Sequence, residues 1–181
     1  MAAVRRIVTA TCGDGIGRVI ASGAAEAVKQ TGGGGSIREI WRTASLTGSE
    51  LCARVEDMPA DAEPAFAPPA GGTGCRIVTI PPDSERWGSP EALLAVARAI
   101  GADRPAAWLD RHPGMHLTPT LDYAVLLSGR LVLVMEEGEV ELAPGDVIVQ
   151  QAAAHAWKNT GTVPAVMFVV MLGMQDSPVG E

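Results

Sequence analysis

Short runs of β-branched and aliphatic residues, separated by glycine turns, fill the last third of the chain and constrain its fold more than any other feature. The runs occupy residues 122–128, 130–135, 139–142, 147–150 and 166–172. Gly129, Gly138 and the Pro144-Gly145-Asp146 turn separate them. Short strands at intervals of roughly 8–12 residues are typical of antiparallel sandwiches and barrels. The sequence therefore predicts an all-β fold with antiparallel strands.

The upstream part of the chain adds shorter runs with strand composition. We expect strands at residues 5–10 and 36–44, and another at 76–80 that ends before two prolines. The Pro-, Ala- and Gly-rich stretch 56–74 indicates a loop. Residues 89–101 predict a helix, because Ser89 can cap it and Gly101 can end it.

The N-terminal glycines allow two interpretations. A strand, a glycine loop and an Ala-rich stretch also begin a dinucleotide-binding unit, whose glycines follow the spacing G-x-G-x-x-G. Here Gly13, Gly15 and Gly17 follow G-x-G-x-G, and residues 32–35 are four consecutive glycines. We therefore favour a β-hairpin that turns at residues 13–17. The nucleotide-dependent oxidoreductase predicted by the other interpretation would lose NAD binding when Gly15 is replaced.

Charge and cysteine usage exclude several classes of protein. The chain has 14 Lys and Arg residues and 21 Asp and Glu residues, which gives a net charge of −7. This charge argues against nucleic-acid binding, because phosphate contacts need a basic face. The apolar stretch 163–174 is interrupted by Pro164 and Gly173 and is too short to span a membrane. The three cysteines form no disulfide or zinc pattern, and we read no export signal, so we expect reduced thiols and a cytoplasmic location.

Two stretches of the strand-rich region resemble the motifs of the cupin superfamily, specifically its small, single-domain conserved-barrel members. In the first, His116, Asp122 and Gly129 fall in the register of a histidine, a carboxylate and a closing glycine. In the second, Pro144-Gly145-Asp146 leads to His155 and then to Asn159. The chain departs from the family at Thr118, where a second histidine is usual, and at Asp122, where a glutamate is usual.

The resemblance implies an antiparallel jelly-roll β-barrel with an N-terminal strand-rich arm and one or two short helices. Residues 113–174 would form the barrel core, and residues 1–80 would complete it or form a dimer interface. Residues 81–112 would be a connection that contains a helix, and 175–181 a flexible tail. A homodimer is expected on the same ground, with a small molecule as the other partner and neither nucleic acid nor membrane.

A metal centre is the chemistry that the resemblance implies, with His116, Asp122 and His155 as the ligands. Two imidazoles and one carboxylate suit Fe(II) with open positions, and Mn, Ni or Zn would also fit. If 116–122 is a strand, its alternation places His116 and Asp122 on one face together with Thr118 and Thr120, which would line the catalytic site. Pro119 lies within this stretch and calls for an edge or a bulge.

Two functional hypotheses follow from these residues. The first is a metal-dependent enzyme for a small organic molecule, with oxygenase, decarboxylase, isomerase or cyclase chemistry. The alternative is a cupin that binds a small molecule without turnover and in which Thr118 marks a degenerate metal site. Metal analysis separates the two.

Overall fold

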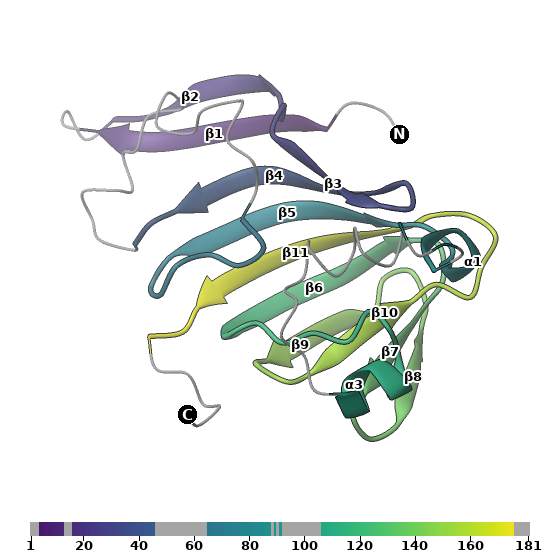
Figure 1. Cartoon of the computed structure of the whole chain (residues 1–181). Helices are drawn as coiled ribbons and strands as arrows, with labels where there is room; N and C mark the ends of the chain where they lie inside the picture. Colours follow the sequence, from purple (N-terminus) through teal and green to yellow (C-terminus); the bar gives the residue numbers. More distant parts are fainter. Residues whose placement is uncertain are drawn as a thin grey trace.

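The computed structural model describes residues 4–12, 16–45, 65–87, 89, 91 and 106–175, and β-strands dominate this part of the chain (Figure 1). This part also contains the short helices α1 (Asp83–Arg86) and α3 (Ala106–Arg111). The strands are β1 (Arg5–Cys12), β2 (Ile16–Ala24), β3 (Val28–Gly32), β4 (Gly35–Thr43), β5 (Thr73–Ile80), β6 (Thr120–Ser128), β7 (Leu131–Met135), β8 (Glu139–Leu142), β9 (Val147–Gln151), β10 (His155–Lys158) and β11 (Ala165–Gly173). The predicted all-β fold class is confirmed.

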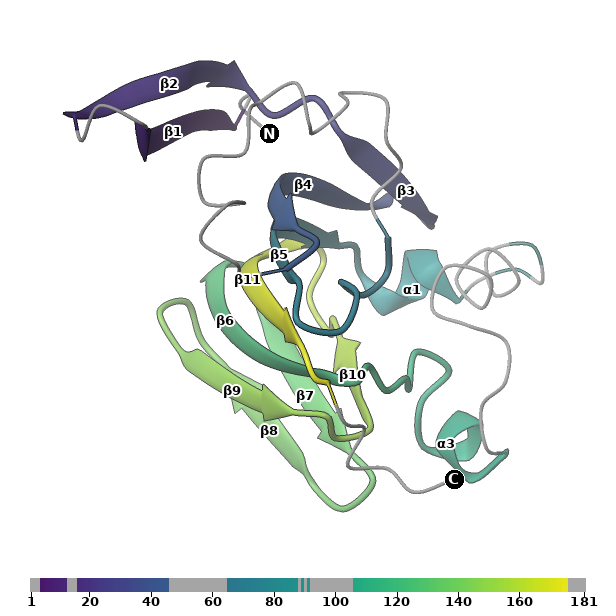
Figure 2. The same cartoon turned by 90° about the vertical axis from the view of Figure 1, so that its left-hand side faces the viewer.

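The strands form two sheets and one separate hairpin, and every pairing given for them is antiparallel. The large sheet has the strand order β3-β4-β5-β11-β6-β9, and the small sheet has the order β10-β7-β8. Among the described strands, β1 and β2 pair only with each other. Figure 2 shows the small sheet lying across one side of the large one, with the hairpin set apart from both. Strands from both halves of the chain therefore share the large sheet.

A hydrophobic core fills the space between the two sheets. Its buried members come from both of them and include Leu126 on β6, Leu131 and Leu133 on β7, and Met167 on β11. Alternate residues of each strand point toward this core, since successive side chains of a strand lie on opposite faces. The alternation decides which polar side chains enter the interior.

β7 is covered on both of its faces. While Leu131 and Leu133 pack into the main core, Val134 packs with Met115 and Ala156 in a second cluster, against which Trp108 of α3 also packs. A strand buried on both faces has a continuous hydrophobic sequence, as Leu131–Met135 does. α3 thus covers the side of the small sheet that faces away from the large sheet.

The predicted elements compare with the observed ones as follows. The N-terminal hairpin is confirmed, and β4, β5, β6, β7, β8, β9 and β11 coincide with the predicted runs, whereas β10 was not predicted. The interpretation of 116–122 as one strand is wrong, because β6 begins at Thr120 and only His116 forms an isolated bridge before it. Pro119 has no N–H for a ladder hydrogen bond, which accounts for the break. Most of the predicted helix 89–101 and residues 56–64 of the predicted loop lie outside the described residues. Residues 65–72 form no strand or helix, and β5 begins at Thr73, inside the range predicted as loop.

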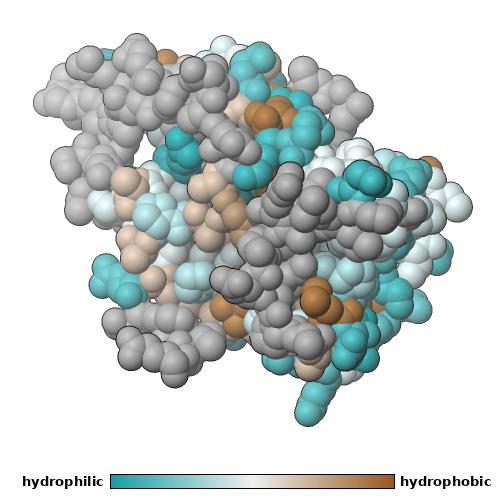
Figure 3. Space-filling model, viewed as in Figure 1, coloured by the Kyte–Doolittle hydropathy of each residue, from teal (hydrophilic) through white to brown (hydrophobic). Residues whose placement is uncertain are grey.

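The surface of the described part is mixed in character. On the face in Figure 3, hydrophilic and hydrophobic residues are interspersed. Among the described residues, no helix combines the length and the apolar character that crossing a bilayer requires.

Gly129, in the β6–β7 turn, provides a test of this packing. Its φ is +87°, and a Cβ there would lie 2.7 Å from the backbone Cα of Ala165. Gly138 has a similar φ of +85° but open space around it. We expect Gly129→Ala to lower the free energy of unfolding by about 3 kcal/mol, from left-handed strain plus a backbone clash, and Gly138→Ala to lower it by about 1 kcal/mol from strain alone. Urea denaturation measures both, and equal losses would contradict the close approach.

Candidate functional site

The interior face of the large sheet changes from apolar to polar along its strands. Near one end, Leu126 on β6 lies opposite Met167 on β11. Toward the other end, Asp122 on β6 lies opposite Met171 on β11 on one side and Gln150 on β9 on the other. Asp122 and Gln150 are both buried. The sandwich therefore has a polar end, and burying polar groups there is costly unless they find partners.

Two histidines meet at this polar end. The backbones of His116 and His155 exchange two hydrogen bonds of 2.9 and 3.0 Å across the isolated bridge. Their ring centroids lie 4.4 Å apart. His155 is the first residue of β10, whereas His116 precedes β6, so this bridge links the two sheets at the polar end.

Backbone carbonyls set the tautomers of both histidines. His116 Nδ1 lies 2.9 Å from the carbonyl oxygen of Gly114, and His155 Nδ1 lies 2.8 Å from that of Ala153. A carbonyl oxygen only accepts hydrogen bonds, so each Nδ1 carries a proton, and in the neutral form of each ring Nε2 carries the lone pair. Metal-binding histidines commonly have this arrangement, with the second nitrogen fixed by a carbonyl.

A short hydroxyl chain leads to the carboxylate of Asp122. The Oγ1 atoms of Thr118 and Thr120 are 2.8 Å apart, and the Thr120 side chain hydrogen-bonds Asp122. Because Thr120 has one O–H to donate, its bond to Asp122 leaves Thr118 as the donor to Thr120. Oδ1 of Asp122 is buried and has no hydrogen-bond partner. One carboxylate oxygen thus keeps its full capacity to accept a proton or a cation.

Burial controls the protonation of this cluster. It raises the pKa of Asp122, although the hydrogen bond from Thr120 and the positive charge of Arg76 partly offset the shift. It lowers the pKa of His155, against a smaller opposing effect of the hydrogen bond to Ala153. Desolvation disfavours the charged form of each group. His155 is therefore neutral at physiological pH, with a basic Nε2.

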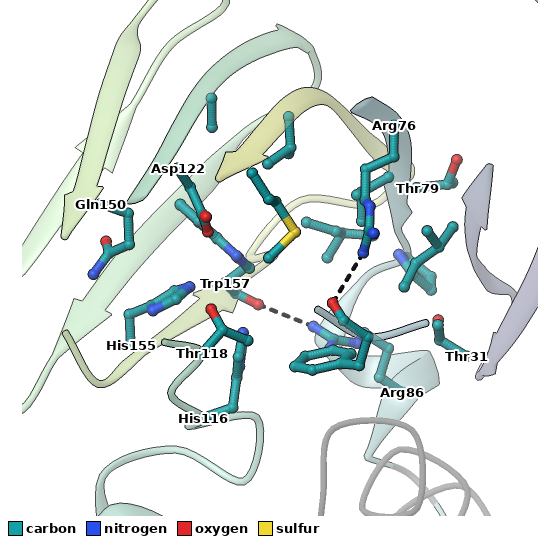
Figure 4. A pocket seen from close by; sticks show the side chains of 18 residues that line it. Thr31, Arg76, Thr79, Arg86, His116, Thr118, Asp122, Gln150, His155 and Trp157 are labelled. Carbon is teal, nitrogen blue, oxygen red and sulfur yellow. Dashed lines mark hydrogen bonds between the residues drawn. The ribbon is translucent and has the colours of Figure 1, made fainter. Parts of the chain in front are cut away.

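These side chains line one pocket of about 110 Å³. Figure 4 shows His116, Thr118, Asp122, Gln150 and His155 around one side of it, and Arg76 and Arg86 around the other. The walls between them are apolar. The volume is somewhat below the roughly 150 Å³ of a cavity that holds benzene, so the pocket suits a small organic molecule.

Of the predicted site residues, the structure brings His116, Thr118, Asp122 and His155 to the pocket wall. Thr120 is buried and lies outside the lining, next to Thr118 and Asp122. Within the described segments, no group of three or more His, Cys, Asp and Glu side chains is arranged closely enough to hold a metal ion. The three-residue metal site remains a prediction.

His112, the third histidine of the chain, is buried outside the pocket lining. Its Nε2 lies 2.9 Å from Asp83 Oδ2, and its Nδ1 accepts a hydrogen bond from the backbone N–H of Gly114. Since Nδ1 is the acceptor, Nε2 donates to Asp83. His112 therefore connects α1 to the segment before His116.

Sequence reasoning missed three pocket residues, Arg76, Arg86 and Gln150. Two of them carry a signal in the strand alternation. Arg76 shares the parity of Gly74, Val78 and Ile80 in a strand that is otherwise poor in charge. Gln150 shares the parity of the buried Ile148 on β9. A polar residue on the inward face of a strand indicates an interior polar site.

Comparison with known proteins shows what part of the chain is similar to. Residues 109–171 match the family model described as "Cupin domain". A cupin-domain-containing oxidoreductase, fogC of Aspergillus ruber, is 38% identical over 79 residues, which cover 39% of this chain and 39% of that protein. The cupin-domain-containing oxidoreductase virC of Hypocrea virens is 40% identical over 62 residues, which cover 32% of each chain. The similarity thus spans about two fifths or less of these relatives.

Among solved structures, the cupin domain of Cnp3 from Schizosaccharomyces pombe aligns with 93% of this chain and 87% of its own, at 10% identity and a TM-score of 0.47.

Asp122→Asn tests the electrostatics of the polar end. Because the folded state raises the pKa of Asp122, its contribution to stability is present below the unfolded pKa and is lost as the pH rises through the folded pKa. In the presence of a chelator we expect Asp122→Asn to raise the free energy of unfolding at about pH 7.5 by about 1 kcal/mol, and the gain to disappear toward about pH 4.

The matched control is Glu141→Gln, which changes an exposed carboxylate on β8 and should alter stability by less than about 0.5 kcal/mol. A gain for Asp122→Asn that is the same at both pH values would show that the ionised carboxylate is not the cause.

Proposed function

We propose that this chain, whose residues 109–171 match the cupin-domain family model, is a metal-dependent enzyme that transforms a small organic molecule in the pocket. The observation that carries the proposal is the pairing of His116 with His155 at the pocket wall that Asp122 also lines. Two lone pairs on Nε2 atoms and one unpartnered carboxylate oxygen are the donors that a divalent cation takes.

The donor set therefore fits a divalent ion in its chemistry, and the unpartnered Oδ1 of Asp122 is the observation that supports the fit. His116, Asp122 and His155 would hold the ion. When bound, it would supply a Lewis acid or, as Fe(II), a centre for oxygen chemistry. Mn, Ni or Zn are the other candidates.

The chain's own residues prepare the pocket in three ways. The carbonyls of Gly114 and Ala153 hold the Nδ1 atoms of His116 and His155 and so fix the orientation of both rings. The hydroxyl of Thr118 lines the pocket and ends the hydrogen-bonded chain to Asp122. Apolar walls that include Trp157 and Met171 exclude water and position an apolar substrate body.

The class of reaction is proposed from the relatives. Oxygenation, decarboxylation, isomerisation and cyclisation all suit such a centre, and the description of two relatives as oxidoreductases favours the redox members of this group.

Metal content tests this proposal. We expect untagged wild-type protein supplied with Fe(II) or Mn(II) to hold about one equivalent, and His116→Ala or His155→Ala to lower the affinity by at least about tenfold. Glu141→Gln is the matched control, because it changes an exposed carboxylate outside the pocket lining and should leave metal content unchanged. Elemental analysis measures all four proteins.

Wild-type protein with less than about a tenth of an equivalent, and no increase on adding Fe(II), Mn(II) or Zn(II), would favour a cupin that binds its ligand without a metal.

We also propose a homodimer formed through the β1–β2 hairpin. This hairpin is a two-stranded sheet of its own and exposes Ile7, Ile16 and Val19, each by more than half. An isolated two-stranded hairpin is at best marginally stable in water. A second copy that covers these side chains would stabilise it.

Light scattering after gel filtration should give about twice the 18.7 kDa of one chain. Val19→Lys should shift the mass toward one chain, whereas Val163→Lys, at an equally exposed valine of the β10–β11 loop, should not. A wild-type mass of one chain would rule out the dimer.

A further inference from the structure

Two guanidinium groups, those of Arg76 and Arg86, lie on the wall of the pocket across from the histidines (Figure 4). We infer that the pocket recognises a small organic carboxylate and that Arg76 binds its negative charge. This inference rests on the proposed function, in that it takes the same pocket as the substrate site, and it adds the chemical class of the substrate.

Arg76 is built into the interior of the large sheet. It lies on the inward face of β5 and is 3% exposed. Gly74, two residues earlier on the same face, leaves room for the guanidinium, since a Cβ at that position would lie 2.9 Å from Nη2 of Arg76. Across the sheet, Arg76 pairs with Val169 on β11, and Val169 in turn pairs with Ala124 on β6. A charged group on this apolar row needs partners within the protein or in a ligand.

The partners of Arg76 within the protein are incomplete. Nη1 donates to the carbonyl oxygen of Phe66 at 2.9 Å, and Nη2 donates to Oε2 of Glu39 at 3.2 Å. Nε of Arg76 and Oε1 of Glu39 are both buried without a hydrogen-bond partner. The ion pair thus uses one N–H and one oxygen, although a guanidinium can bind a carboxylate through two parallel N–H donors. The guanidinium has donors left over for an anion.

The charges around the pocket favour an anion as well. Arg76 and Arg86 line it, whereas Glu39 and Asp83, their carboxylate partners, are outside the lining. Among the described residues of the lining, Asp122 is the one acidic side chain, against two arginines. Arg86 already donates to the carbonyl oxygen of Trp157 and pairs with Asp83. Arg76 likewise has one carbonyl and one carboxylate partner, but it also has a buried nitrogen, Nε, without a hydrogen-bond partner, and this difference favours Arg76 as the cation that binds the ligand.

The shape of the pocket specifies the remainder of the molecule. Its volume of about 110 Å³ and its apolar wall, which includes Val78, Val169 and Met171, suit a compact branched body best, and an aromatic ring would fill the whole pocket. A carboxylate on Arg76 would direct this body toward His116 and His155 on the other side. The recognised class is thus a small apolar acid rather than a sugar or a nucleotide.

Two pairs of isosteric probes test the inference: benzoate against benzamide, and isobutyrate against isobutyramide. Calorimetric titration of the full chain should show at least one carboxylate binding about tenfold or more tightly than its amide, because an Arg–carboxylate bond is charge-assisted. Arg76→Gln should abolish this preference. Arg130→Gln, which removes an exposed arginine, should preserve it.

Arg76→Gln leaves Glu39 buried without its cation and can impair folding, so Glu39→Gln/Arg76→Gln provides a second variant that removes both charges. We expect it to fold, as monitored by circular dichroism, and to bind each acid and its amide equally. A double variant that still prefers carboxylates would overturn the inference, as would a wild-type chain that binds neither acid better than its amide.

The same samples keep this inference separate from the proposed function. Metal content is measured on each, and every titration is repeated after chelation. A carboxylate preference that disappears with the metal and survives Arg76→Gln would assign anion binding to the metal and overturn the inference. A preference that persists without metal and requires Arg76 supports the inference whatever the metal content.

Discussion

The position of β11 between β5 and β6 is the constraint on which the interior of this protein depends. Hydrogen bonding on both edges of β11 sets the register of both neighbours, and strand alternation then decides which side chains point inward. Through this register Arg76, Asp122 and Gln150 come from three strands into one interior. Slipping β11 by one residue would turn Met167 and Met171 out of the core, so the packing of the apolar end also maintains the polar end.

The two ends of the sandwich have different requirements. At the apolar end, close packing of aliphatic side chains is sufficient. At the polar end, each buried group needs a partner, and the carbonyls of Gly114 and Ala153, together with Thr120, provide several of them. The partners that are missing, at Asp122 and in the Glu39–Arg76 pair, face or border the pocket. Incomplete pairing in an otherwise well-packed interior is where a ligand gains the most binding energy.

The sequence predicts the strands well and the site in part, for a physical reason. Turn glycines and short aliphatic runs are local signals, so the N-terminal hairpin and the late strands could be located from them. His116, Asp122 and His155 could be named because a motif links them. Arg76 enters the site only through pairing between β5 and β11, which are nearly 90 residues apart in the chain, and no local pattern encodes that pairing. The break at Pro119 had a local signal, and the buried position of His112 did not.

β7 gives the polar end a second source of control. Met115, which immediately precedes His116, is fully buried on the outer side of the small sheet, in the cluster with Val134 and next to Trp108 of α3. The placement of one pocket histidine is therefore decided on the face of the sheet that a ligand never touches. Sequence variation in α3 can change the geometry of the histidine pair while every residue of the pocket wall stays the same. Related chains can therefore diverge in chemistry through this outer cluster without altering their binding surface.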